Sequence, residues 1–178
     1  FCVLAIDIVY LMTTISDAHI ENLTQQVADL LVSKKLVLVT AESCTGGWVA
    51  KSCTDINGSS AWFDRGFVTY SNQAKQDLLG VSEPTLAEFG AVSEQTAIEM
   101  AIGAIDFSQA NISIAVTGIA GPTGGSQQKP VGTVWLAWAL KNGAISSGLY
   151  RFSGDRESIR RQAVSAALEG IIKNARDA

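Results

Sequence analysis

The sequence predicts an α/β protein with three layers (α/β/α), in which a mixed sheet of about five or six strands lies between helices. The predicted elements run in the order helix, strand, helix, strand, three helices, three strands and helix. Several of the strand segments are continuously apolar, and strands that are buried on both faces need helices on each side of the sheet. A hydrophobic fraction of 47% and a charged fraction of 17% are typical of one globular domain with a substantial core.

The helices are indicated by capping residues and by apolar positions at helical spacing. Ser16 or Asp17 can cap a first helix, and Ser71 or Asn72 can cap a short helix that stops at Gly80. Further helices are expected over residues 48–53, after Ser82, after Ser93 and from about Asp155 onward.

The strands are short apolar or alternating segments between turn residues. They are expected over residues 35–40, 64–70, 112–116, 131–140 and 144–152. The last two are separated by Lys141-Asn142-Gly143 and resemble an antiparallel hairpin, because an Asn-Gly pair favours the primed turns that match strand twist.

Polar or glycine-rich segments follow three of these strands, where open α/β sheets tend to bind ligands. The first runs from Ala41 to Gly47, and a hydroxyl at such a strand-to-helix turn can be exposed, with nearby amides facing a developing oxyanion. Ser43 fits this description. The only histidine, His19, lies in the first predicted helix, so the base would be another group. A buried lysine can serve, and Lys75 is one candidate among several.

Each of these residues also has a purely structural interpretation. Ser43 could be a helix N-cap, and Lys75 a solvated lysine on a short helix. Tyr70 could fill the core edge, and Cys44 fits a small buried hydrophobe. Arg156 at a helix start opposes the helix dipole, which suggests that it is held there for an anion, although a surface position is equally compatible.

Charge and cysteine content exclude several classes of protein. The net charge is −4 and the basic residues are scattered, so no surface for nucleic acid is expected. The three cysteines have no metal-ligand spacing, and unpaired thiols suit a reducing cytoplasm. No apolar run approaches the ~20 residues of a membrane helix.

The N-terminal residues 1–11 are apolar but lack a basic leader and a clear cleavage site. Met12 could be the natural start, so residues 12–178 are expected to form the single domain and residues 1–11 a non-native or upstream extension.

Three motifs, in the right order, resemble the C-terminal domain family of the competence/damage-inducible protein CinA. They are Ala-Glu-Ser-Cys-Thr-Gly-Gly at 41–47, Thr-Tyr-Ser-Asn-Gln-Ala-Lys at 69–75 and Val-Thr-Gly-Ile-Ala-Gly-Pro at 116–122. The likeness extends from roughly Ile20 to Ala175, although many members carry a second, N-terminal domain that this sequence does not show.

The resemblance implies the activity and the roles of individual residues. Active members hydrolyse the carboxamide of nicotinamide mononucleotide to nicotinic acid mononucleotide and ammonia, without a metal or other cofactor. The family places the nucleophile at Ser43, the base at Lys75 and a supporting hydroxyl at Tyr70. The remaining residues implied for the substrate site are Glu42, Thr45, Gly46, Gly47, Thr117, Gly118, Gly121 and Arg156.

The phosphate of such a substrate needs amide donors or cations, and several groups could supply them. The glycine-rich turns offer backbone N–H groups, while Arg156 and Lys129 offer charge. The loop from Thr117 to Gly125 is favoured, because glycines allow a close approach of backbone to ligand. Two alternatives remain at this point, a catalytically silent pyridine-nucleotide-binding module and an amidohydrolase of another small amide. The sequence is compatible with a homo-oligomer.

Overall fold

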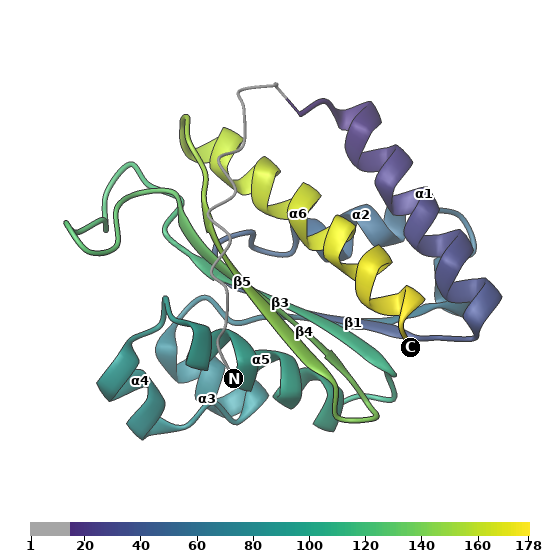
Figure 1. The fold of residues 1–178 in the computed structure, drawn as a ribbon, viewed down its shortest axis with the longest axis horizontal. Coiled ribbons are helices and arrows are strands. Elements are labelled where there is room, and N and C mark those ends of the chain that lie inside the picture. The colour runs from purple at the N-terminus through teal and green to yellow at the C-terminus, as the bar shows by residue number, and fades with distance from the viewer. Residues whose placement is uncertain (1–14) are drawn as a thin grey trace.

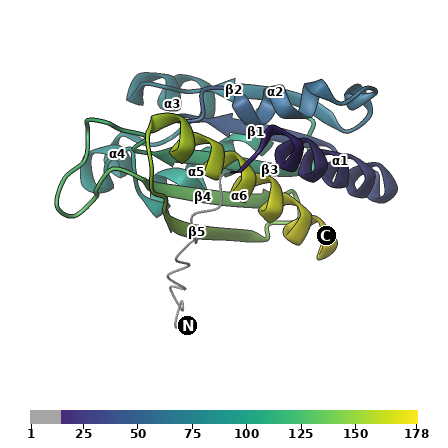
Figure 2. The same cartoon turned by 90° about the horizontal axis from the view of Figure 1, so that it is seen from above.

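The computed structural model describes residues 15–178 and confirms the three-layer α/β/α architecture (Figures 1 and 2). Its sheet has five strands in the order β2-β1-β3-β4-β5. The elements are α1 (Asp17–Lys34), β1 (Leu38–Glu42), α2 (Trp48–Asp55), a 3-10 turn η1 (Ser59–Ala61), β2 (Phe63–Val68), α3 (Asn72–Leu79), α4 (Glu83–Phe89), α5 (Glu94–Asp106), β3 (Ile112–Gly118), β4 (Thr133–Leu140), β5 (Ile145–Arg151) and α6 (Arg156–Arg176). The predicted extension over residues 1–11 and the predicted start at Met12 lie outside the described residues.

Helices cover both faces of the sheet, as Figure 1 shows, with α1, α2 and α6 on one face and α3, α4 and α5 on the other. Two separate groups of buried side chains result. Alternation along β1 divides its residues between them, because successive strand side chains point to opposite faces. Leu38 packs with the α1 and α6 side, whereas Val39 and Ala41 pack with the α5 side. Within the described range, no helix is long and apolar enough to cross a membrane.

The order of the strands creates a switch point beside β1. The chain leaves β1 through α2 and returns in β2 on one side, then passes through α3, α4 and α5 to β3 on the other side. The strands β1, β2 and β3 are parallel, and Glu42 is level with Val68 and Val116. Their carboxyl ends therefore meet at one edge of the sheet, where the chain connections diverge and where open sheets of this kind bind ligands.

Two local predictions differ from the structure. The first strand is displaced toward the C-terminus, because residues 38–42 pair with both β2 and β3 and the ladder extends to Glu42. The β4–β5 hairpin and its loop over residues 141–143 are confirmed, but the predicted primed turn is wrong. The loop has three residues, and only the last of them, Gly143, has a positive φ (+95°). This pattern is that of a type I turn followed by a left-handed residue.

Candidate active site

The turn after β1 is held from inside by the carboxylate of Glu42. Its two oxygens accept hydrogen bonds of 2.8 to 3.1 Å from the backbone N–H groups of Gly47, Val49 and Ala50 at the start of α2. The Thr45 hydroxyl donates to the same carboxylate at 2.7 Å. First-turn N–H groups have no partner within a helix, and the helix dipole favours a negative charge beside them. Glu42 therefore acts as the cap of α2.

The side chain of Ser43 is free of this capping role, because Glu42 fulfils it. The N-cap interpretation of Ser43 is therefore wrong. Its backbone N–H donates to the Val116 carbonyl at 2.9 Å, which ties it to the end of β3. Gly46 and Gly47, with φ of +63° and +94°, then turn the chain into α2 in a conformation that suits glycine.

The amine of Lys75 lies beside the Ser43 hydroxyl. Its Nζ is 3.1 Å from Ser43 Oγ and 2.8 Å from the Thr69 carbonyl oxygen, to which it donates. Lys75 is 1% exposed and Ser43 is 8% exposed. The solvated interpretation of Lys75 is therefore wrong.

Burial lowers the pKa of Lys75 to about 8, from an ordinary value of 10.5, because a charged amine loses its hydration there. No carboxylate in residues 15–178 forms an ion pair with it. At pH 7 the shift increases the neutral fraction of the amine by roughly 300-fold. A neutral Lys75 can accept the Ser43 proton while it still donates to Thr69, so the pair can perform acyl transfer.

A cavity of about 330 Å³ opens over this pair at the carboxyl edge of the sheet. Its lining comes from α3, the end of β3, the start of α6 and four connections. It consists of Ser43, Cys44, Tyr70, Lys75, Ala91, Val92, Thr117, Gly118, Ile119, Ala120, Gly121, Thr123, Gly124 and Arg156. The volume lies within the range of small-molecule sites. Cys44, which also lines the cavity, is buried. Its burial raises the pKa of the thiol to about 12, so the side chain stays a neutral thiol.

The mouth of the cavity is bridged by Arg156. Its guanidinium donates to the Tyr70 hydroxyl at 2.9 Å and to the Gly121 carbonyl at 2.7 Å. Tyr70 is 62% exposed, so the interpretation of its ring as core filler is wrong. Both acceptors of Arg156 are neutral, and within residues 15–178 it forms no ion pair, so its charge is available to an anionic ligand.

The glycine-rich loop supplies backbone donors on the same side. The N–H groups of Ala120, Gly121, Thr123 and Gly124 have no acceptor among residues 15–178, and all four residues line the cavity. The Thr117 hydroxyl donates to the Ala91 carbonyl at 2.7 Å, which fixes the α4–α5 connection against the end of β3. Unpaired amides together with a cation are the donors that a phosphate group requires.

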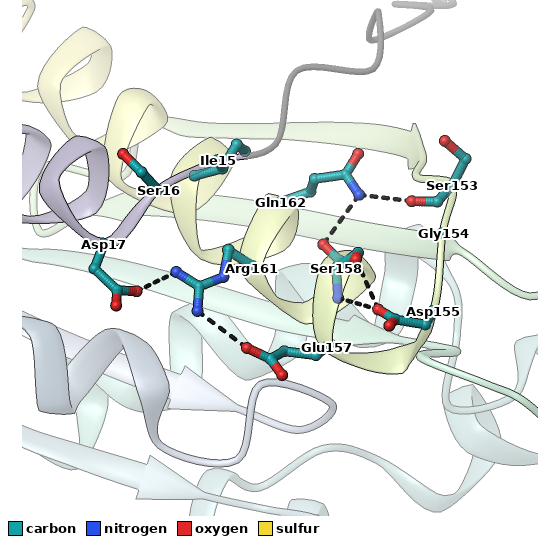
Figure 3. Close-up of a pocket in the computed structure, with 10 residues that line it drawn as sticks. All are labelled: Ile15, Ser16, Asp17, Ser153, Gly154, Asp155, Glu157, Ser158, Arg161 and Gln162. Carbon is teal, nitrogen blue, oxygen red and sulfur yellow. Dashed lines mark hydrogen bonds and ion pairs between the residues drawn. The ribbon is translucent and has the colours of Figure 1, made fainter.

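A larger cavity of about 500 Å³ lies elsewhere, between the N-terminal ends of α1 and α6 (Figure 3). Its charged side chains are already occupied, since Arg161 forms ion pairs with Asp17 and Glu157, and Asp155 caps α6 through Ser158. Neither Ser43 nor Lys75 lines it. We therefore place the candidate active site in the smaller cavity.

The structure brings part of the predicted substrate site together and separates the rest. Thr117, Gly118, Gly121 and Arg156 line the cavity together with Ser43, Tyr70 and Lys75. In contrast, the predicted substrate residues Glu42, Thr45, Gly46 and Gly47 lie outside its lining and build the turn instead. Lys129, a candidate for the phosphate, donates to the Phe89 carbonyl and is also absent from the lining.

Two contributions to this site were missed from the sequence. Ala91 and Val92 form part of the wall, and as small apolar residues between two helices they carry no local signal of a site. Arg160 contacts the turn from α6, and its position four residues after Arg156 places both on one face of the helix. That spacing is a signal that could have identified it.

The fold and the cavity define an α/β protein with a hydroxyl–amine pair at the carboxyl edge of a mixed sheet. The model of the CinA C-terminal domain matches residues 20–175, and the chain belongs to this family.

Similar proteins agree with this assignment. Nicotinamide-nucleotide amidohydrolase PncC of Escherichia coli (strain K12) is 54% identical over 156 residues, which cover 88% of this chain and 94% of that protein. A protein of the same name from Pseudomonas putida is 51% identical over 136 residues, covering 76% and 84%. The crystal structure of competence/damage inducible protein CihA from Agrobacterium tumefaciens has a TM-score of 0.86 and 49% identity, and covers 91% of this chain and 98% of that one.

Proposed function

We propose that the protein is a nicotinamide-nucleotide amidohydrolase, which hydrolyses the carboxamide of nicotinamide mononucleotide to nicotinic acid mononucleotide and ammonia. The observation that carries the proposal is the 3.1 Å contact between Lys75 Nζ and Ser43 Oγ in a cavity. Relatives that are 51–54% identical bear the name of this activity.

In the proposed first step, neutral Lys75 takes the proton of Ser43 as Oγ attacks the carboxamide carbon. The Lys75 ammonium then returns a proton to the nitrogen, so the C–N bond breaks and ammonia leaves a nicotinoyl ester on Ser43. The positive pyridinium of the substrate withdraws electrons from the carboxamide and favours this attack.

In the second step, water attacks the ester carbonyl while Lys75 again accepts a proton. The C–O bond to Ser43 then breaks and the serine recovers its proton from Lys75. The Thr69 carbonyl accepts a hydrogen bond from Nζ, which keeps the amine oriented toward Oγ. Proton transfer alone balances both steps, so the mechanism requires no metal.

The phosphate of the substrate is proposed to lie between Arg156 and the amides of Ala120, Gly121, Thr123 and Gly124. The unpaired state of these donors within residues 15–178 and their position at the cavity support this placement. It agrees with the sequence-based preference for the loop over residues 117–125, and it assigns Lys129 no role in binding the phosphate.

A cytoplasmic location is part of the same proposal, since Cys44 and Cys53 are buried free thiols. A nucleotide-sized cavity also supports a small molecule, rather than a nucleic acid, as the ligand.

The direct test is an ammonia assay with purified protein and nicotinamide mononucleotide, with and without EDTA. We expect ammonia and nicotinic acid mononucleotide in equal amounts, at a rate that the chelator leaves unchanged. A folded protein whose melting temperature rises with the nucleotide but which forms no product would support the silent binding module instead. Turnover of other small amides but not of this nucleotide would support the second alternative.

The rate should depend on pH through Lys75, because only its neutral form is a base. The pKa is lowered to about 8, so we expect kcat/KM to increase about tenfold per pH unit well below pH 8 and to level off above it. The profile is best measured between pH 7 and 9, where the second phosphate ionisation of the substrate is largely complete and a pKa of about 8 gives roughly a tenfold total increase. A flat profile between pH 7 and 9 would argue against Lys75 as the titrating base.

Replacing Arg156 with glutamine should impair recognition of the phosphate. We expect the KM for nicotinamide mononucleotide to increase by about 10- to 100-fold, the range for a lost hydrogen bond to a charged group. The preference for the nucleotide over nicotinamide riboside, which lacks the phosphate, should decrease by a similar factor. Arg151→Gln is the control, because Arg151 is exposed on β5 and outside the cavity lining. An unchanged preference in Arg156→Gln would place the phosphate elsewhere.

A further inference from the structure

Arg160 connects α6 to the turn that carries Ser43. Its Nε donates to the Cys44 carbonyl at 3.0 Å, and its Nη2 donates to the Thr45 carbonyl at 2.8 Å. The guanidinium also lies over the Trp48 ring, 5.4 Å from its centroid, at the start of α2. Arg160 is partly buried and has no carboxylate partner within residues 15–178. Its hydrogen-bonding capacity is directed at two consecutive peptides of the turn.

These contacts determine the direction of the peptides that follow the nucleophile. In a trans peptide, the N–H of the next residue points opposite to the carbonyl. With the Thr45 carbonyl held by Arg160, the Gly46 N–H points away from it, and it donates to the Ser43 carbonyl at 3.0 Å. The held Cys44 carbonyl likewise fixes the N–H of Thr45. Arg160 thus reaches the Ser43 peptide through a single intermediate hydrogen bond.

Arg160 adds a contact from outside the turn to those that Glu42 and Val116 supply from within the fold. Gly46 and Gly47 are both left-handed, and glycine has more conformational freedom than other residues. Glu42 holds the Thr45 side chain and the start of α2, but neither the Cys44 nor the Thr45 carbonyl. The Thr45 carbonyl also accepts a longer hydrogen bond of 3.3 Å from the Trp48 N–H, so Arg160 supplies the shorter of its two contacts. The rigid fork of a guanidinium can hold both carbonyls at once, which the single ammonium of a lysine does less well.

We propose that Arg160 is a positioning residue, which fixes the Ser43 turn in its reactive geometry without touching the substrate. The turnover assay for this inference rests on the proposed function. The inference itself concerns the reactivity of the Ser43 hydroxyl, which a chemical probe can measure without the substrate. Arg160 itself does not line the cavity, so the proposal assigns a role in the site to a residue behind the turn.

The neighbouring Arg161 provides a matched control. It lies on the same helix and over the same Trp48 ring, 5.0 Å from the centroid. Its guanidinium forms ion pairs with Asp17 and Glu157, as Figure 3 shows, and it donates no hydrogen bond to residues 43–47 of the turn. Arg161 therefore shares the charge, the helix and the stacking of Arg160, but not its hydrogen bonds to the two carbonyls.

The experiment compares Arg160→Lys, Arg160→Gln and Arg160→Ala with the same three changes at Arg161. For Arg160→Lys we expect kcat to decrease by about 10- to 100-fold with KM within about threefold, because only the reacting geometry is impaired. The rate at which a fluorophosphonate probe labels Ser43, followed by intact mass, should decrease in parallel. Added guanidinium ion should restore part of the rate of Arg160→Ala and leave Arg161→Ala unchanged.

The two readouts separate this inference from the proposed function. A wild-type protein that hydrolyses no nicotinamide mononucleotide, but labels in a manner that depends on Arg160, would refute the proposed substrate and support the positioning role. Wild-type kcat and labelling in folded Arg160→Lys and Arg160→Gln would overturn the positioning role. Equal losses in the Arg160 and Arg161 series would also overturn it, since they would indicate a general effect of α6 on stability.

Discussion

Ser43→Ala is expected to reduce kcat for nicotinamide mononucleotide by at least roughly 10⁴-fold, since it removes the atom that forms the covalent ester. The fold should remain intact. The Ser43 hydroxyl contacts Lys75 but caps no helix, and the Glu42 carboxylate holds the turn without it. We therefore expect a melting temperature close to that of the wild type, together with retained binding of the substrate as measured by thermal stabilisation.

Ser52→Ala is the control for this variant. Ser52 is a buried serine in α2 whose hydroxyl donates to the Trp48 carbonyl, so it reports the effect of losing a buried hydroxyl without chemistry. It should retain most of the activity. Turnover by Ser43→Ala within tenfold of the wild type would show that water, rather than serine, attacks the amide.

Lys75→Met is expected to reduce kcat by roughly 10²- to 10⁴-fold, the usual contribution of a general base. Methionine has a similar length and no proton-accepting nitrogen, so the buried volume remains filled while the base is lost. The increase of activity with pH through about 8 should disappear in the residual rate, because the group responsible for it is absent. The measurement is the pH profile of kcat/KM for the variant beside that of the wild type.

The control for the lysine is Lys141→Met, since Lys141 is exposed in the β4–β5 loop. It should leave both the rate and the pH profile unchanged. If Lys75→Met retained the wild-type profile, the titrating group would be another residue, and the contact between Nζ and Oγ would have a structural role only.

The fold was largely predictable because its determinants are local. Ser16, Ser71, Ser82, Ser93 and Asp155 each accept a hydrogen bond from the first turn of the helix that follows, as their residue types predict. Strand limits were less predictable. β1 continues past Thr40, where the predicted strand ended, to Glu42, because pairing with neighbours on both sides, rather than local hydrophobicity, decides where it ends.

The site was predictable where a motif specifies it and not where packing does. The resemblance indicated Ser43 and Lys75, and the structure places them in contact, but burial of the amine is a tertiary property that the sequence could not show. Glu42 stood in the same motif and was assigned to the substrate. Strand alternation turns its side chain toward α2, on the opposite side of β1 from Ala41 and the α5 layer.

The arrangement around β1 has a consequence for relatives of this protein. The groups that shape the turn, Glu42 and Thr45, are chemically independent of the groups proposed to react, Ser43 and Lys75. Ser43 and Lys75 could therefore be substituted during evolution without loss of the fold, and the resulting proteins would share the same backbone structure. Overall shape will then be a poor guide to activity among such proteins, and the two side chains at positions 43 and 75 will be the informative ones.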